Sequence, residues 1–410
     1  MEMRKYGIIY GAGEYPIGSS ARRLRMWHRA LKHSGIYTKL IIAHPAPSTN
    51  DVKNSEDFVH FMLESQAGLD VEALMTRNYK HIFGKIIGLW HALKFIKGQT
   101  DKLDFILLYG GGFFEGWLLM RLCKKQGIQF LIERTDENRR RFKNKKNIYD
   151  HLAIAYEDLF EKYIIPRCDT LFVVSAYLKD KFQKRFPGLN IKRTVPSMID
   201  LDEFYALQEK SLSDLTIPGL DVFKSKKIKF VFAGSCIFPN GLKFFLKNAA
   251  ELIRQGYDFK IVFIVFKGHI REIKDYVQEL GITEYFTMIE NILPDYIPAC
   301  YKSADVLVMP EMGKEVANAG FPGKTAEYLA VGVPIVTTDF SNIKDVLTHG
   351  ENCVMSPIGD DVAYQANLKK LLDDGEIREV IGGKAAQSAK QFFDYRESLK
   401  HITEELCPTS

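Results

Sequence analysis

The stretch that decides the fold is residues 304–338, ADVLVMPEMGKEVANAGFPGKTAEYLAVGVPIVTT. Its first apolar run, residues 305–309, has the length of a buried strand. A glycine-bearing loop follows, and we expect Gly323 to open a short helix that Gly332 closes before a second apolar run begins at Pro334. The order strand, loop, helix, strand predicts part of a parallel sheet with the loop at its carboxyl edge.

That edge is where open α/β folds bind anions, because backbone N–H groups and the positive end of a helix point at it. Lys324 adds a positive charge at the start of the expected helix, and Glu327 lies one turn further on. A carboxylate there can accept hydrogen bonds from hydroxyl groups beside a phosphate. The alternative is a structural crossover with a solvated lysine and glutamate.

The same residues resemble the donor-sugar signature of family 4 glycosyltransferases, which have the GT-B fold. Members typically carry two glutamates separated by seven residues, with Gly-Phe after the first and a run E-x-L/M-A-x-G-x-P-V/I-V from the second. The residues that match are Gly320, Phe321, Glu327, Leu329, Ala330, Gly332, Pro334, Ile335 and Val336. A P-x-K-x-x-E-Y version of the motif is matched by Pro322, Lys324, Glu327 and Tyr328.

One position departs from the signature, because Ala319 stands where the first glutamate is expected. In the family the first glutamate contacts the transferred sugar and the second contacts the ribose of the nucleotide. The resemblance therefore assigns the ribose to Glu327, and backbone amides around Gly320 and Phe321 to the sugar and the distal phosphate. The candidates for the missing sugar contact are Asn318, Glu315 and Glu311.

Weaker matches to the family run along nearly the whole chain. Residues 6–35 resemble its opening strand, glycine loop and first helix, and residues 169–178 resemble a segment near the end of the first domain. Residues 195–204 resemble the entry to the second domain, and residues 352–357 a late strand. Their order and spacing together make the resemblance specific.

Two further glycines are assigned to the donor phosphates. Gly18 matches the glycine that approaches them in the family, although a turn glycine without another role fits equally well. Gly234 follows the first strand of the second domain, where many relatives place an Arg and a Lys against the diphosphate. This chain has Ser235 at the Arg position, so the charge must come from Lys243 or, more simply, from Lys324.

A group of charged residues follows the expected strand 129–132 of the first domain. A carboxylate at this position can orient the acceptor hydroxyl or accept its proton, and Asp136 is our candidate. The alternative is a surface charge cluster. Its members are Glu133, Arg134, Asp136 and Glu137.

Length and periodicity predict two domains. A chain of 410 residues with 46% hydrophobic content suits two packed cores. Alternating strand and helix patterns predict doubly wound parallel sheets, and the resemblance implies two Rossmann-like domains facing across a cleft. We expect the acceptor-side domain at 1–196, the donor domain at 203–384, and a C-terminal helix at 385–410 that packs back on the first. Strands are expected at 6–10, 39–43, 105–109, 129–132, 170–174, 228–233, 259–266, 285–289, 305–309 and 334–338.

Charge and cysteine usage bear on the compartment. The formal net charge is +5, and the positions 139–146 and the first helix are strongly basic. A solvated basic face is one explanation, and attraction to an anionic membrane or a lipid-phosphate acceptor is the other. No nucleic-acid recognition motif accompanies the charge. No apolar run has the length of a membrane span, no signal peptide is evident, and the six cysteines are scattered. These features predict a cytoplasmic protein, and the basic segments favour a location at the inner face of the membrane.

Other cofactors are disfavoured. Gly11-x-Gly13 lacks the third glycine of a dinucleotide site, the histidines show no metal-ligand spacing, and no P-loop or Gly-x-Ser-x-Gly elbow occurs. Asp200-x-Asp202 imitates a metal-binding motif but matches the family's interdomain segment. We therefore expect no metal and no cofactor, with a nucleoside-diphosphate sugar as donor substrate.

The function that the resemblance implies is that of a retaining, metal-independent hexosyltransferase. Its acceptor would be a glycan or a lipid-linked sugar in cell-surface polysaccharide synthesis. Two alternatives stay open, a nucleotide-sugar epimerase of GT-B type and a non-catalytic relative that binds nucleotide or sugar. The sequence leaves the base, the sugar, the acceptor, the linkage and the oligomeric state undetermined.

Overall fold

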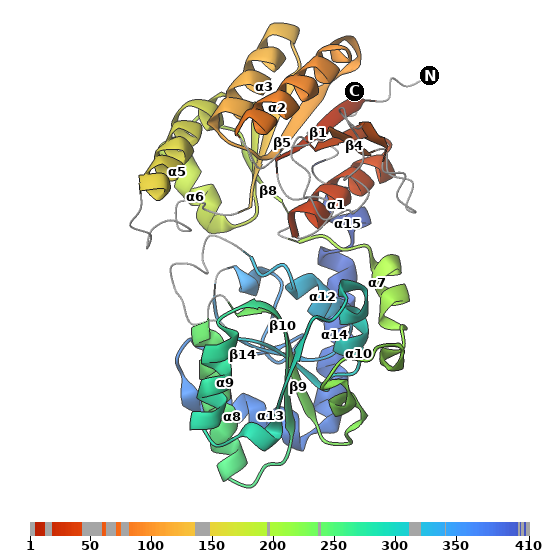
Figure 1. Ribbon diagram of the computed structural model, residues 1–410, viewed down its shortest axis with the longest axis vertical. Coiled ribbons are helices and arrows are strands. Elements are labelled where there is room, and N and C mark those ends of the chain that lie inside the picture. The colour runs from red at the N-terminus through yellow and green to blue at the C-terminus, as the bar shows by residue number, and fades with distance from the viewer. Residues whose placement is uncertain are drawn as a thin grey trace. The chain divides into compact units, whose positions relative to one another are not determined.

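The computed structural model describes residues 5–12, 19–42, 60–62, 71–74, 82–135, 148–194, 197–236, 239–310, 321–340, 342–400, 402 and 406. The chain divides into two compact units (Figure 1). The first comprises Met1–Met198 with Tyr395–Ser410, and the second comprises Ile199–Asp394. Each is a doubly wound α/β domain.

The first unit contains an eight-stranded sheet with the order β3-β4-β2-β1-β5-β6-β7-β8. Neighbouring strands pair in parallel, except that β3 is antiparallel to β4. The five expected strands appear, and three strands of three or four residues, β3, β4 and β8, add to them. The bounds are β1 (Tyr6–Ala12), β2 (Tyr37–Ile42), β3 (His60–Met62), β4 (Val71–Leu74), β5 (Phe105–Gly110), β6 (Gln129–Arg134), β7 (Thr170–Val173) and β8 (Ile191–Arg193).

Helices of the first unit connect these strands. Leu24, Trp27 and Leu31 recur on one face of α1 and are buried against the sheet, as their spacing predicts. Gly35 ends this helix with a φ of 79°, which glycine adopts without strain. The helices are α1 (Ser19–His33), α2 (Ile82–Lys97), η2 (Thr100–Lys102), α3 (Phe113–Gln126), α5 (Ile148–Leu159), the π-helical η3 (Phe160–Ile164), η4 (Ile165–Arg167), α6 (Ala176–Arg185) and α15 (Tyr395–Ser398).

The end of the chain is divided between the two units, which differs from the expected helix at 385–410. The helix α14 (Gly375–Phe392) belongs to the second unit, and Phe393 is buried there. The chain rejoins the first unit only at Tyr395, where Leu399 and Ile402 enter the core that contains Trp27. The observed division at Met198 falls inside the segment between the two expected domains.

The second unit contains a six-stranded, entirely parallel sheet with the order β11-β10-β9-β12-β13-β14. Five of these strands were expected, because parallel strands buried on both faces are continuous apolar runs. The sixth, β14, was expected only from the resemblance of residues 352–357 to a late strand of the family. Their bounds are β9 (Lys229–Cys236), β10 (Lys260–Gly268), β11 (Phe286–Glu290), β12 (Val306–Met309), β13 (Ile335–Thr338) and β14 (Val354–Ser356).

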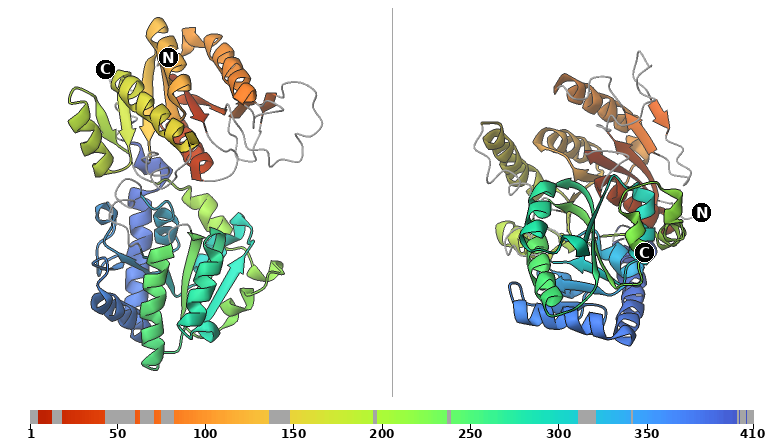
Figure 2. Two further views of the ribbon diagram at one scale, coloured as in Figure 1. Left: turned by 60° about the vertical axis from the view of Figure 1, so that its left-hand side comes forward. Right: turned by 60° about the horizontal axis from the view of Figure 1, so that its bottom comes forward.

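Helices cover both faces of this sheet. Figures 1 and 2 show α8 and α9 on one side, with α10, α12 and α14 on the other. The bounds are α7 (Leu201–Gln208), η5 (Leu212–Asp214), η6 (Leu220–Lys224), α8 (Pro239–Arg254), α9 (Ile270–Glu279), η7 (Thr283–Tyr285), η8 (Pro294–Tyr296), α10 (Ile297–Lys302), α12 (Thr325–Ala330), η9 (Ile343–Asp345) and α13 (Asp361–Asp373). None of the helices in the described part of the chain combines the length and apolar character needed to cross a bilayer.

Candidate functional site

The strands β9 and β12 stop pairing before the carboxyl end of β9. Their register pairs Phe230 with Val306 and Val231 with Leu307, and Lys229 O accepts a hydrogen bond from the N–H of Asp305. Alternate residues of a strand point their N–H and C=O groups to the same side, so Ala233 also faces β12. Beyond Val231, however, side chains of the segment that contains α12 form hydrogen bonds with the backbone groups on this side of β9.

Lys324 and Tyr328 bind the two backbone groups of Ala233. The ammonium group of Lys324 donates to Ala233 O at 2.8 Å, and the N–H of Ala233 donates to the hydroxyl oxygen of Tyr328 at 3.1 Å. Residues four apart lie on the same face of a helix, which lets both side chains reach one strand residue. The hydroxyl of Tyr328 is fully buried, and burial raises its pKa well above the usual range of phenols, so it remains protonated.

The position of Lys324 is further defined by two neighbours. Its Nζ lies 4.1 Å from the centroid of the Phe232 ring, a cation–π contact. A Cβ atom at Gly234 would lie 2.4 Å from the same Nζ, and the φ of Gly234 is 155°, so glycine suits both the space and the backbone. Cys236 lies near this charge: burial raises the pKa of its thiol, and Lys324 opposes that shift. A fixed cation therefore lies at the carboxyl edge of the sheet, where the sequence predicted one.

Glu327 lies on the same short helix. Its side chain is half-buried, and its Oε2 accepts a hydrogen bond from the hydroxyl group of Tyr301 on α10, at 3.3 Å. Tyr301 in turn packs edge-on against Tyr328, with ring centroids 5.0 Å apart. The helix begins at Thr325 and has six residues, with Lys324 at its N-cap position, so it starts two residues later than Gly323. Gly332 follows its end with a φ of 74°, as expected.

The other residues assigned to the donor do not all join this group. Lys243 forms an ion pair with Glu272 at 2.6 Å and lies over the ring of Tyr276, so its charge is engaged on the α8–α9 side of the sheet. The ring of Phe321 packs on Phe393, with centroids 6.1 Å apart. Ser235 is exposed. The residues that lie outside the described part of the chain are Gly18, Asp136, Glu311, Glu315, Asn318, Ala319 and Gly320.

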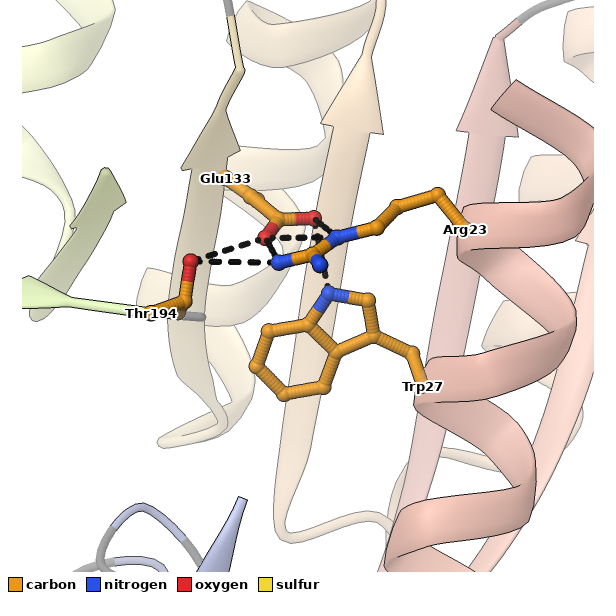
Figure 3. Close-up of polar contacts among 4 residues, drawn as sticks. All are labelled: Arg23, Trp27, Glu133 and Thr194. Carbon is orange, nitrogen blue, oxygen red and sulfur yellow. Dashed lines mark hydrogen bonds and ion pairs between the residues drawn. The ribbon is translucent and has the colours of Figure 1, made fainter. Parts of the chain in front are cut away.

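In the first unit, Glu133 forms a buried polar cluster with three other side chains (Figure 3). Its Oε1 accepts from Nη2 of Arg23 at 2.5 Å, and its Oε2 accepts from Nε1 of Trp27 at 2.7 Å. The hydroxyl of Thr194 accepts from Nη2 of Arg23 at 3.1 Å and lies 3.3 Å from Oε1. The cluster joins the first turns of α1 to the carboxyl ends of β6 and β8.

This cluster corrects one interpretation of the charged residues that follow strand 129–132. The alternative of a surface charge cluster is wrong for Glu133 and Arg134, which are 2% and 4% exposed. Arg134 forms an ion pair with Glu157 and lies over the ring of Phe160, 5.3 Å from its centroid. Buried charges are retained only when they are paired, which explains why both residues have partners on other elements.

Sequence reasoning missed Arg23, Tyr301 and the polar role of Trp27. Trp27 was recognised only as a core residue, because its spacing on α1 is apolar, and nothing local connects it with Glu133. Asp200 is a helix cap: its side chain accepts from the N–H of Glu203 at the start of α7, which gives Asp200-x-Asp202 a structural role. Among the described residues, no group of three or more His, Cys, Asp or Glu side chains is arranged to hold a metal ion.

Solved structures of other proteins share this fold. The structure of HepE (Alr3699) from Anabaena, solved in complex with UDP, superposes with a TM-score of 0.67 at 13% sequence identity, covering 99% of this chain and 100% of that chain. At this identity the likeness shows a shared fold. The chain therefore has the GT-B fold, built from two Rossmann-like α/β domains.

The sequence of the second unit is similar to that of known glycosyltransferases. Residues 227–374 match the family model described as "Glycosyl transferases group 1". Spore coat protein SA of Bacillus subtilis is 25% identical over 276 residues, 63% of this chain and 69% of that protein. D-inositol 3-phosphate glycosyltransferase of Corynebacterium jeikeium is 25% identical over 262 residues, 60% of each chain. The match thus spans 69% of the first of these relatives and 60% of the second. Residues 227–374 of the second unit are thus similar to the group 1 glycosyltransferases, in a chain that has the GT-B fold.

Proposed function

We propose that the chain is a retaining glycosyltransferase that moves a hexose from a nucleoside-diphosphate sugar to a glycan or lipid-linked acceptor in cell-surface polysaccharide synthesis. The observation that carries the proposal is the ammonium group of Lys324, held at the carboxyl edge of the sheet in the domain that matches the group 1 family. We favour UDP as the nucleotide, because HepE has the same fold and was solved with UDP.

Lys324 serves the step in which the donor is cleaved. In sugar transfer, the bond between the anomeric carbon and a diphosphate oxygen breaks, and the acceptor oxygen bonds to the anomeric carbon. The proton of the acceptor hydroxyl passes to an oxygen of the departing diphosphate. Negative charge develops on the departing diphosphate. A cation that is already oriented stabilises this charge without reorganisation, and loss of such a group typically costs on the order of 10²–10³ in rate.

Glu327 serves donor binding in this proposal. A carboxylate accepts hydrogen bonds from both hydroxyl groups of a ribose, and the hydroxyl of Tyr301 holds its Oε2 from one side. Glu327 lies one helical turn after Lys324, so the ribose and the diphosphate of one nucleotide would be bound by neighbouring side chains of the same element. The resemblance to the donor signature supports this division of roles.

Several finer features remain part of the proposal. We assign the stabilisation of the departing diphosphate to Lys324 and not to a metal ion. We infer retention of the anomeric configuration from the family resemblance. We assign acceptor binding to the first unit. We also propose that the protein works in the cytoplasm at the inner face of the membrane.

The experiment is a thermal-shift panel of UDP, GDP and ADP, each with and without EDTA, on the wild-type protein and on Lys324→Met. A ligand that binds only the native state raises the free energy of unfolding by mass action, by about 2.7 kcal/mol at a hundredfold excess over Kd, and so raises Tm. We expect UDP to raise Tm, EDTA to leave the shift unchanged, and Lys324→Met to reduce it. The donor-site proposal fails if no nucleotide raises Tm, and metal independence fails if EDTA abolishes the shift.

Incubation with UDP-sugars separates the proposal from its two alternatives. A transferase leaves the donor sugar unchanged without an acceptor, whereas an epimerase converts it. If the protein is a non-catalytic relative, nucleotide will raise its Tm, but no sugar will be transferred to any lipid or glycan extract.

A further inference from the structure

The first unit carries an exposed apolar surface at the start of α3 and along α5, which we call the α3–α5 face. Its residues are Phe114, Leu152, Tyr156, Leu159 and Tyr163, which are between 40% and 61% exposed. Figure 2 shows α5, in yellow, lying across the front of the first unit in its left-hand view. Large apolar side chains gathered on one surface indicate an interaction site, because single exposed ones are scattered in ordinary proteins.

The four residues from α5 and η3 form one stripe. Leu152, Tyr156, Leu159 and Tyr163 are spaced by four, three and four residues, which places them on the same side of a helix. The stripe continues through the end of α5 into the π-helical turn of η3. An amphipathic helix normally buries such a stripe in its own domain, whereas here the stripe is exposed while Phe160 and Ile164 beside it are buried.

Tyr156 ties α3 to this stripe. Its hydroxyl accepts a hydrogen bond from the N–H of Phe114 at 2.8 Å and donates to Oε2 of Glu115 at 3.3 Å. A Cβ atom at Gly112 would lie 2.1 Å from the Tyr156 ring, so the close approach requires a glycine. The ring of Phe113 contacts those of both Tyr156 and Tyr163, with centroids 6.3 Å away in each case. The start of α3 and the stripe therefore form one preformed surface.

The fully exposed charged side chains around this face are basic. Residues 151–163 are all described, and their fully exposed polar side chains are those of His151 and Lys162. Two carboxylates near the face, Asp158 of α5 and Glu115 of α3, are half-buried. Glu157 and Glu161 are buried in ion pairs, Glu157 with Arg134 and Glu161 with Lys181 and Arg185. The carboxylates of Glu157 and Glu161 therefore point into the protein and are neutralised there.

The adjoining part of α3 is basic as well. Its exposed charged side chains are Arg121, Lys124 and Lys125. The guanidinium group of Arg121 lies 4.5 Å from the centroid of the Trp117 ring, so a cation is held beside the aromatic residues. In the sequence, the basic run at 139–146 ends two residues before α5 begins.

We propose that the α3–α5 face docks on the surface of an anionic lipid bilayer. Tyrosine and leucine side chains would enter the headgroup region, where rings with one polar end are favoured, and Lys162 and Arg121 would lie against lipid phosphates. A second copy of this chain is a poorer occupant. A two-fold contact sets the same patch against itself, so the basic groups would oppose one another. The proposal rests on the proposed location at the inner face of the membrane and names the surface responsible. It can be tested separately from the donor site, since docking requires no donor.

The test is flotation with vesicles of phosphatidylglycerol and phosphatidylcholine in equal parts, compared with phosphatidylcholine alone. The variant Leu152→Glu/Leu159→Glu should bind the anionic vesicles at least about tenfold more weakly, because it removes apolar area and adds two repelled charges. The matched control is Val362→Glu/Val380→Glu, which makes the same change at residues of the second unit that are 81% and 57% exposed. It should bind as the wild type does.

A second variant measures the electrostatic part. Arg121→Gln/Lys162→Gln should weaken binding about fivefold per residue, and raising the salt concentration should shrink that difference. Far-UV circular dichroism and the Tm shift with UDP check that each variant remains folded, and they report on the donor site separately from docking.

Three results would overturn the proposal. The first is a wild-type protein that ignores anionic vesicles, and the second is a Leu152→Glu/Leu159→Glu variant that binds them normally. The third is a dimer in solution that this variant dissociates while no vesicle binding occurs, which would make the face a contact between two copies.

Discussion

The ammonium group of Lys324 donates a hydrogen bond to the carbonyl oxygen of Ala233, 2.8 Å away, at a point where β9 has lost its pairing with β12. A lysine from the loop–helix segment thus takes the place of a neighbouring strand. The bond holds the charge at the carboxyl edge of the sheet, and the four predictions below concern this edge and the buried cluster of the first unit.

Lys324→Met should weaken UDP binding about tenfold to a hundredfold, because a hydrogen bond to a charged group contributes about 1.5–3 kcal/mol. The methionine keeps an apolar stem on Phe232, so the protein should stay folded. Isothermal titration calorimetry gives Kd for both proteins. Lys243→Met is the comparator: its lysine is paired with Glu272, and its UDP affinity should equal that of the wild type. The reverse ranking of the two variants would move the anion site to Lys243.

Gly234→Ala should also weaken UDP binding, because its Cβ would lie 2.4 Å from Nζ of Lys324 and displace that group. The comparator is Gly332→Ala, where φ is 74° and a Cβ would meet neighbours no closer than 3.5 Å. That change should reduce the free energy of unfolding by about 1–2 kcal/mol through backbone strain alone. UDP affinity unchanged in Gly234→Ala and lowered in Gly332→Ala would contradict the assignment.

Glu327→Gln keeps the shape of the side chain and removes its charge. We expect about tenfold weaker UDP binding, since bonds to a charged acceptor are stronger by roughly 1 kcal/mol or more. The same variant should bind 2′,3′-dideoxy-UDP as the wild type does, because that nucleotide has no ribose hydroxyl groups to lose. Equal losses for both nucleotides would show that Glu327 does not bind the ribose.

Glu133→Gln should destabilise the first unit by about 3–5 kcal/mol, because it leaves the charge of Arg23 buried without its partner. Urea denaturation followed by tryptophan fluorescence reports on this unit selectively, since Trp27, Trp90 and Trp117 all lie in it. Glu397→Gln removes an exposed ion pair with Lys400 in the same unit and should cause no measurable change. Equal stability of the two variants would mean that the buried pair contributes nothing.

Much of the second unit was predictable from local patterns. Apolar runs bounded by glycine and proline marked its strands, because a parallel strand buried on both faces has no polar side to interrupt the run. The run at 322–328 likewise predicted that Lys324 and Glu327 share one short helix. In the first unit, β3, β4 and β8 were missed, because three or four residues are too few to show a period.

By itself, the sequence determined the fold class, the order of the strands along the chain and the segment that carries Lys324 and Glu327. Only the tertiary structure decided which partners the polar groups take. Arg23 and Glu133 are 110 residues apart and meet because α1 packs on the sheet beside β6. It was also the packing of α12 that brought Lys324 to Ala233, while Lys243 paired with Glu272. The physical reason is that periodicity is a property of neighbouring residues, whereas a buried charge takes whichever partner the packed elements bring within reach.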